Sequence, residues 1–231
     1  MAFYYLLLGH LIGDFVLQTD KIAENKGRHW KWNLLHVLVV TLCIFLFSYT
    51  FGTLLLVMVL LNGPIHFVLD YYKNRIGKVL HFSDLVSFLM DQLIHIILLY
   101  FISQTAVYGS QHVIDFVTVR FLIVIVLITF FSAVFTQFIL AALFPRTDSR
   151  FFEKGEKYAG FITRGYVTSI FYISIIQSPY YLLLLIAAAT AFLLLFKLSW
   201  NKWMSPSHLF VKLLLDITIS TACIFLMFLP Y

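Results

Sequence analysis

The sequence GHLIGDFVLQ, at residues 9–18, places a histidine and an aspartate four residues apart inside an apolar run. In a helix, His10 and Asp14 would lie on the same face, one turn apart. In a membrane-spanning helix both side chains are expensive to bury, so such residues usually serve a function. The chain repeats this spacing twice, as HFVLD at residues 66–70 and, in reverse order, as DQLIH at residues 91–95.

The composition is typical of an integral membrane protein. Of the 231 residues, 61% are hydrophobic and only 12% are charged, and the mean hydropathy is +0.93. Soluble domains carry about 25% charged residues. The apolar runs recur along the whole chain and are continuous, without the alternation of barrel strands, which predicts helical spans. We therefore expect an all-α fold, a polytopic membrane helical bundle, in one domain over residues 1–231.

The apolar runs predict about eight transmembrane helices. Their expected bounds are residues 2–18, 34–50, 53–72, 85–103, 119–143, 161–177, 180–197 and 209–229. Loops after the first, third, fifth and seventh runs are rich in Lys and Arg, whereas the other loops are nearly devoid of them. By the positive-inside rule, the basic loops lie in the cytoplasm and both termini lie outside. The net charge of +5 thus reflects topology and contact with lipid headgroups, and nucleic acid is not an expected partner.

On this topology the polar pairs meet at one depth. Because neighbouring helices run in opposite directions, the reversed order of Asp91 and His95 brings them level with the pairs on the first and third spans. The aspartates form one layer near the cytoplasmic face, three histidines form the next, and His36 lies beside the aspartates. The seven candidate metal ligands are His10, Asp14, His36, His66, Asp70, Asp91 and His95. Residues 1–103 are therefore the predicted metal-site half, and residues 104–231 a supporting half.

This set of side chains favours metal chemistry. Imidazole nitrogens and carboxylate oxygens are the usual ligands of Zn, Mn and Fe, and seven exceed the needs of one tetrahedral ion. One or two divalent ions are expected, and two ions about 3.5–4 Å apart typically polarise a phosphoryl group and generate hydroxide. Asp14, Asp70 and Asp91 are the candidate catalytic residues, since an uncoordinated aspartate could act as general base. The same residues could instead form a proton or ion pathway, or structural pairs.

Three further residues are candidates for substrate contacts. Arg164 and Lys157 lie on the predicted cytoplasmic side and could bind a phosphate or carboxylate group, although flanking positive charge also explains them. Gln18 lies one turn from Asp14 and could orient it, or could be an ordinary interfacial polar group.

Two segments close to the motifs have simpler explanations. Glu24, Asn25 and Lys26 could shape the mouth of the site, but a solvated loop is the simpler expectation. The sequence Asn-Gly-Pro at residues 62–64 predicts that the helix breaks or tightens just before His66.

The motifs resemble those of a known family. Four segments carry the resemblance: GHLIGDFVLQTDKIAENK from residue 9, His36, HFVLDYYKNR from residue 66 and DQLIHIILL from residue 91. Together they resemble a bacterial family of uncharacterised integral membrane proteins with GHxxxDFxxQT, HxxxD and DQxxH motifs. That family is similar to membrane-bound metal-dependent hydrolases, including the LexA-regulated inner-membrane group. Its members tend to carry an acidic residue before an arginine in the second half, where this chain has Thr163-Arg164, so that role is not carried over.

The resemblance and the motifs together predict a metal-dependent hydrolase of the bacterial cytoplasmic (inner) membrane, with its site facing the cytoplasm. A site at the headgroup boundary favours a membrane lipid or another amphiphilic, phosphorylated substrate, such as a phospholipid or an isoprenoid phosphate. The alternative is a divalent-cation or proton transporter that uses the same His and Asp residues. A transporter would need polar residues that continue across the membrane. The substrate, the metal and a homo-oligomeric state are left open.

Overall fold

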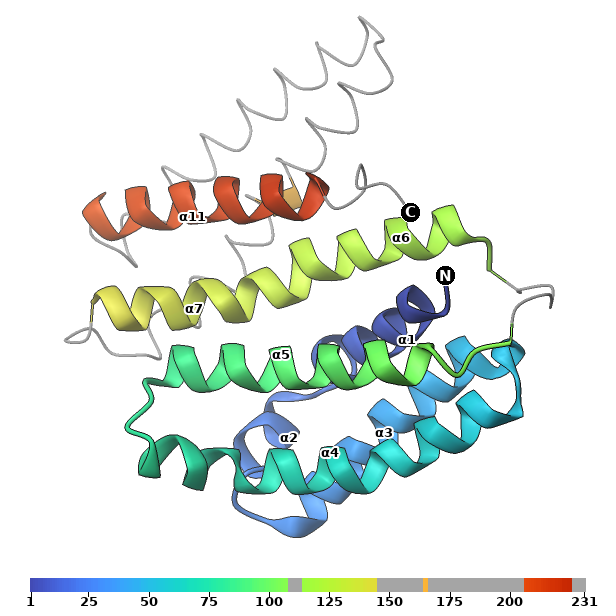
Figure 1. The fold of residues 1–231 in the computed structure, drawn as a ribbon. Helices are drawn as coiled ribbons and strands as arrows, with labels where there is room; N and C mark the ends of the chain where they lie inside the picture. The colour runs from blue at the N-terminus through green and yellow to red at the C-terminus, as the bar shows by residue number, and fades with distance from the viewer. Residues whose placement is uncertain (108–113, 145–163, 166–205, 226–231) are drawn as a thin grey trace, which may run out of the picture. The chain divides into compact units, whose positions relative to one another are not determined.

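The computed structural model describes residues 1–107, 114–144, 164–165 and 206–225. These residues form helices and turns and no strand, so the all-α prediction is confirmed for this part of the chain (Figure 1). The chain divides into two compact units, Met1–Val126 and Leu127–Tyr231, which we describe separately. The expectation of a single domain stays a prediction.

The first unit is a bundle of helices joined by short turns. Its elements are α1 (Ala2–Leu11), a π-helical turn (Ile12–Val16), α2 (Asp20–Asn25), α3 (Trp30–Ser48), a 3-10 turn (Tyr49–Phe51), α4 (Thr53–Val79), α5 (Asp84–Ser103) and α6 (Phe116–Val126). Helix α1 packs against α3, α5 and α6, and α4 packs between α3 and α5 (Figure 1). Every predicted metal ligand lies in this unit.

Local sequence signals set several helix ends. The side chains of Thr19 and Ser83 accept hydrogen bonds from backbone N–H groups in the first turns of α2 and α5, as N-cap residues do. Gly52 has a φ of +100°, a conformation that favours glycine, and it separates α3 from α4. The predicted break near Pro64 is wrong, because α4 continues through this residue.

The second unit is described only in part. A π-helical turn (Leu127–Phe131) leads into α7 (Ser132–Leu143), and α11 (Pro206–Phe225) packs against α7. Phe144, Arg164 and Gly165 are the other described residues of this unit.

Four helical segments are long and apolar enough to cross a membrane: Trp30–Phe51, Thr53–Lys73, Asp84–Ser103 and Phe116–Leu143. They indicate a membrane protein, with four candidate spans in the described residues in place of the eight that we predicted. Each corresponds to one predicted span, the second to the fifth.

The other four predicted spans have different outcomes. Residues 2–18 contain the shorter apolar helix Ala2–Val16, which is about 22 Å long and falls short of a hydrocarbon core of about 30 Å. The predicted spans 161–177 and 180–197 lie outside the described residues, apart from 164 and 165. The last prediction, 209–229, overlaps α11, which is not among the four candidates.

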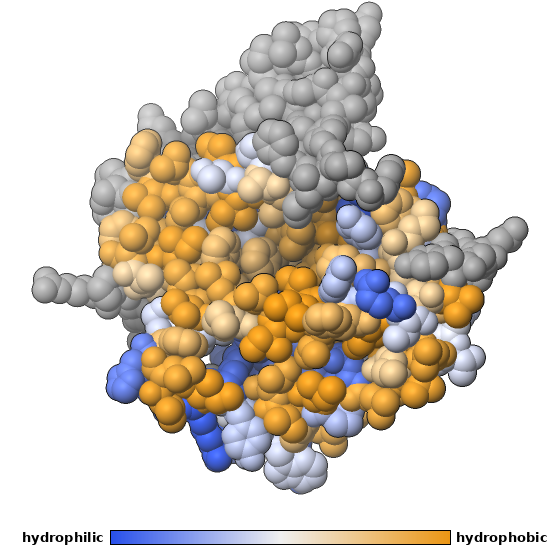
Figure 2. All heavy atoms as spheres, viewed as in Figure 1, coloured by the Kyte–Doolittle hydropathy of each residue, from blue (hydrophilic) through white to orange (hydrophobic). Residues whose placement is uncertain are grey.

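The helices of the first unit carry apolar side chains outward and polar side chains inward. Leu38, Leu60 and Leu93, one on each of α3, α4 and α5, are 49–58% exposed. Apolar residues also cover much of the surface visible in Figure 2. The buried polar residues of these helices include His10, Asp14, Asn33, His36, Asn62, His66, Asp70, Asp91, Gln92 and His95. A soluble bundle shows the opposite pattern, so this distribution supports burial in lipid.

Two glycines let α1 approach α3 closely. A Cβ atom on Gly9 would lie 2.6 Å from Ile44 Cα, and one on Gly13 would lie 2.6 Å from Val40 Cα. Backbone contacts of this kind are typical of small residues four positions apart in membrane helices. This approach holds the histidine and aspartate of the first motif against α3.

We expect Gly9→Ala to destabilise the purified protein in detergent. The added methyl group would also meet the Cys43 carbonyl oxygen at 2.8 Å, so the backbone would have to move. Such overpacking typically costs about 1–3 kcal/mol. Thermal unfolding followed by circular dichroism measures the change. Gly63→Ala is the matched control, because outside its own helix only side-chain atoms lie within 4 Å of its Cβ position, the nearest being Thr41 Oγ1 at 3.3 Å. Equal melting temperatures for the two variants would contradict the close packing.

Candidate metal centre

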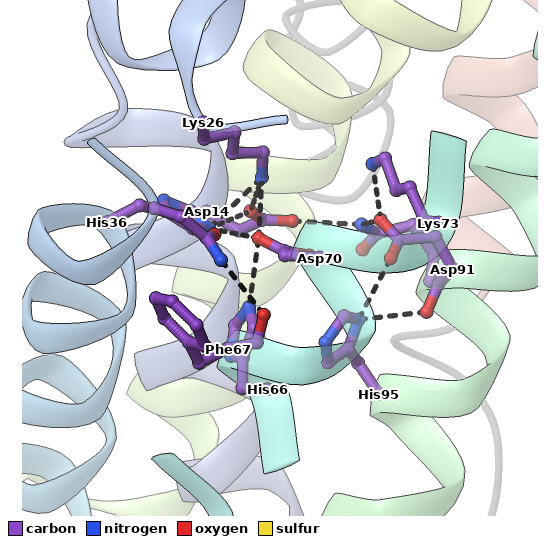
Figure 3. A network of polar contacts seen from close by, with 11 residues as sticks. Asp14, Lys26, His36, His66, Phe67, Asp70, Lys73, Asp91 and His95 are labelled. Atoms are coloured by element: carbon purple, nitrogen blue, oxygen red, sulfur yellow. Dashed lines mark hydrogen bonds and ion pairs between the residues drawn. The ribbon is translucent and has the colours of Figure 1, made fainter. Parts of the chain in front are cut away.

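The structure brings all seven predicted ligands together in the core of the first unit. They come from α1, the π-helical turn, α3, α4 and α5, and each is at most 6% exposed. Figure 3 shows Asp14, Asp70 and Asp91 in one layer, with His66 and His95 on one side and the ammonium groups of Lys26 and Lys73 on the other.

A local change of helix type accompanies Asp14. The backbone N–H of Leu17 bonds to the Ile12 carbonyl oxygen, five residues earlier, at 2.9 Å. The first motif is therefore not a regular α-helix beyond Leu11. Single π-helical turns often occur at functional sites, and nothing in the sequence pattern predicts this one.

The histidines present nitrogen atoms that have no hydrogen-bond partner. His95 Nδ1 donates to the backbone carbonyl oxygen of Asp91 at 2.8 Å, so its Nε2 carries a free lone pair when the ring is neutral. Within the described residues, Nε2 of His10, His66 and His95 is buried without a hydrogen bond. The ring of His66 lies 4.2 Å from that of His95 and 6.0 Å from that of His10, centroid to centroid. Three convergent, unsatisfied imidazoles indicate a ligand site.

The carboxylates differ in how well they are satisfied. Asp14 accepts a hydrogen bond from Gln92 Nε2 at 2.9 Å and contacts His36 Nε2 at 3.1 Å. Asp70 accepts no hydrogen bond from the described residues, although its Oδ2 lies 3.3 Å from His36 Nε2 and 3.6 Å from His66 Nε2. Asp70 thus has unused acceptor capacity at the centre of the cluster.

Two overlapping sets of ligands could each hold a metal ion. One is His36, His66 and Asp70, and the other is Asp70, Asp91 and His95. Within each set the ligand atoms lie within 4.8 Å of one another. The mixed nitrogen and oxygen donors suit Zn, Mn or Fe, and the unsatisfied atoms of His66, Asp70 and His95 fit such an ion. Asp70 belongs to both sets, as a carboxylate shared by two ions would.

The remaining predicted ligands, His10 and Asp14, belong to neither set. His10 stacks on the ring of His95 at a centroid distance of 5.3 Å. Asp14 borders the first set through its contact with His36. Whether either one binds a metal stays a prediction.

Lys26 is part of the cluster, so the expectation of a solvated loop is wrong for this residue. It is 8% exposed, and its Nζ lies 3.3 Å from Asp14 Oδ1 and 3.2 Å from Asp70 Oδ2. Burial opposes the charge of Lys26, but the carboxylates of Asp14, Asp70 and Asp91 outweigh burial and raise its pKa. Lys26 is therefore charged at neutral pH. A signal for this role was available, because Lys26 ends the first of the four segments that carry the family resemblance.

Lys73 pairs with the third carboxylate. Its Nζ lies 2.9 Å from Asp91 Oδ2, and its side chain is 27% exposed. Sequence reasoning missed Lys73 too, but a signal was available: it follows Asp70 by three residues on α4 and so projects toward the same face. Gln92, next to Asp91, donates a hydrogen bond to Asp14 Oδ2 at 2.9 Å.

The predicted substrate contacts fare differently. Lys157 lies outside the described residues. Arg164 belongs to the second unit, where it is buried and pairs with Asp216 at 3.3 Å and donates to the Thr129 carbonyl oxygen at 3.3 Å. Gln18 has a buried Oε1 without a hydrogen bond in the described residues, and a role in orienting Asp14 falls to Gln92 instead.

The fold and the cluster define a class of protein: a helical membrane protein with a buried His/Asp site. Residues 2–123 match DUF3307, described as a protein of unknown function, and the chain belongs to this family. The match includes all seven predicted ligands. No curated protein and no solved structure matches the chain. The family match and the four apolar helices are compatible with an uncharacterised membrane protein, whereas similarity to hydrolases stays a prediction.

The two lysines should differ in their effect on stability. With chelator present, we expect Lys26→Met to lower the free energy of unfolding by about 3–5 kcal/mol, because it leaves buried carboxylates unpaired. Lys73→Met should cost about 0–1 kcal/mol, because the Lys73 side chain is partly exposed. Chemical unfolding in detergent measures both. A larger loss for Lys73→Met than for Lys26→Met would contradict this account of the cluster.

Proposed function

We propose that this protein is a membrane-embedded, metal-dependent hydrolase whose centre holds two divalent ions through His36, His66, Asp70, Asp91 and His95. The observation that carries the proposal is the pair of ligand sets that share Asp70, together with three buried atoms that make no hydrogen bond in the described residues: Nε2 of His66, Oδ1 of Asp70 and Nε2 of His95. A purely structural network would be expected to satisfy its buried polar atoms.

The chain's own residues suit hydrolysis of a phosphate ester. When bound, divalent ions polarise a phosphoryl oxygen and activate water. Asp14 belongs to neither ligand set and is held by Gln92, which suits it to accept a proton as the general base. Lys73, partly exposed beside Asp91, is suited to meet the negative charge of a phosphate group.

The position of the site along the helices favours an amphiphilic substrate. Asp70 and Asp91 lie near the ends of the candidate spans Thr53–Lys73 and Asp84–Ser103 that flank the basic residues 73–78 in the last turns of α4. The positive-inside rule then orients the site toward the cytoplasm in a bacterial cytoplasmic membrane. A phospholipid or an isoprenoid phosphate would bring its phosphate to this depth.

Buried apolar residues beyond the histidines favour an enzyme over a transporter. One turn past His10, His36 and His95, on the side away from the aspartates, the same helix faces carry Leu6, Val40 and Leu99. On α4 the corresponding residue is Asn62, but Val59 and Leu55 follow and are buried. A pathway for ions would need polar groups at these positions.

Metal analysis tests the proposal directly. We expect protein purified without chelator to carry a stoichiometric transition metal by elemental analysis, and Asp70→Asn to lose it. Asp115→Asn is the matched control: Asp115 is exposed, outside the cluster, and accepts a hydrogen bond from the backbone N–H of Thr118, a role that Asn also fills. Metal-free wild-type protein, or equal metal content in both variants, would refute the metal centre.

An activity assay tests the reaction. With Mn²⁺ or Zn²⁺ added, we expect release of phosphate from phosphatidic acid or an isoprenoid phosphate in mixed micelles, and a loss of about a hundredfold or more in Asp14→Asn, because the general base is removed. Uptake of Mn²⁺ into proteoliposomes without phosphate release would favour the transporter instead.

A further inference from the structure

We propose that Lys26 is an internal cation that occupies one of the two metal positions, the one next to His36, and must withdraw before a divalent ion binds there. This inference rests on the proposed metal centre and adds the residue that controls how the centre is loaded. Loading is then sequential: the first ion binds at Asp70, Asp91 and His95, and the second displaces Lys26.

The contacts of the ammonium group carry this inference. Lys26 Nζ lies 3.0 Å from His36 Nε2, 3.3 Å from Asp14 Oδ1 and 3.2 Å from Asp70 Oδ2. These three atoms come from three separate helical elements, and His36 Nε2 lies 3.1 Å and 3.3 Å from the two oxygens. The ammonium group thus contacts two of the three donors of the first ligand set, His36 and Asp70, together with Asp14 beside them (Figure 3).

A divalent ion cannot share these donors with the lysine. Metal–ligand distances are about 2.0–2.2 Å for nitrogen and oxygen donors, so an ion on His36 and Asp70 would lie close to the ammonium group. The side chain of Lys26 is 10% exposed and that of Asp70 is 1% exposed, so water screens their charges poorly. Repulsion between the two cations would therefore oppose binding until Lys26 moves away.

The second ligand set is less obstructed. Of its three members Lys26 contacts only Asp70, at Oδ2, and Oδ1 of Asp70 makes no hydrogen bond in the described residues. Lys73 contacts a single ligand atom, Asp91 Oδ2, and its side chain is 27% exposed, so it can turn toward solvent. In the described residues, Nε2 of His95 makes no hydrogen bond. This set should take up the first ion. An ion bound to Asp70 there would also weaken the attraction between Asp70 and Lys26. Displacement of Lys26 by the second ion would then be easier.

Lys26 is placed so that it can withdraw. It follows α2, a six-residue helix outside the candidate spans, and its ammonium group lies on the side of the carboxylates away from His66 and His95. Withdrawal on this side leaves the histidine layer undisturbed. The displaced ammonium group would remain beside the loaded centre.

Titration with Mn²⁺ or Zn²⁺ tests the inference on the full-length protein in detergent, with binding followed by calorimetry or a competing indicator dye. We expect wild type to bind one ion tightly and a second ion weakly. In Lys26→Met the affinity for the second ion should rise at least about tenfold, because the competing charge is gone. Lys21→Met is the matched control: Lys21 lies on α2, the helix just before Lys26, is exposed and contacts the ring of Trp32. The affinity of the Lys21→Met variant for the second ion should stay within about threefold of the wild-type value.

The outcomes separate this inference from the proposed function. If both proteins bind two ions but Lys26→Met leaves the second affinity unchanged or lowers it, Lys26 does not compete and the inference is wrong. If neither binds an ion, the metal centre itself is wrong. Should Lys26→Met fail to fold, the double variant Asp14→Asn/Lys26→Met removes one buried carboxylate with the lysine. The double variant should bind the second ion at least about tenfold more tightly than Asp14→Asn does. Equal affinities of these two variants for the second ion would overturn the inference.

Discussion

Three carboxylates buried in an apolar bundle are the constraint on which this structure depends. Asp14, Asp70 and Asp91 lie where water is scarce, and unpaired charge there is strongly unfavourable. The protein meets this constraint with cations from outside the motifs, Lys26 on two carboxylates and Lys73 on the third. Lys26 thereby ties a segment outside the candidate spans to the interior of the bundle.

Close packing of the helices positions the side chains of the His/Asp cluster. Close approach of the backbones at Gly9 and Gly13 brings the first motif against α3, which carries His36. Asn33, one turn earlier on α3, donates to the Phe67 carbonyl oxygen at 2.9 Å and so fixes α3 against α4 beside His66. The apolar surface can then face lipid, because the polar side chains have partners or ligand positions inside.

A lysine ammonium group and a divalent metal ion are alternative ways to neutralise the buried carboxylates. The donors that surround the ammonium group of Lys26 are oxygen and imidazole nitrogen, which also bind divalent ions. A site of this kind stays neutralised when no metal is bound, and it can exchange one cation for another without unfolding. The second unit shows the same principle in a different setting, since Asp216 is buried there between Arg164 and Lys212. Buried carboxylates paired with long basic side chains are thus a recurrent feature of the described chain.

The sequence by itself determined the helical class, the apolar character and the gathering of seven His and Asp side chains. Those features follow from local spacing, because four-residue intervals fix a helix face and reversed order fixes direction. Tertiary structure alone decided that Asp70 belongs to both ligand sets and that the chain turns into a π-helix at Asp14. It also decided that Lys26 reaches the cluster: the direction of a short segment between helices depends on how those helices pack, which no periodicity encodes. In the described residues, the first predicted span proves shorter than a bilayer for a related reason, since hydropathy marks apolar runs without showing whether a helix is long enough to cross.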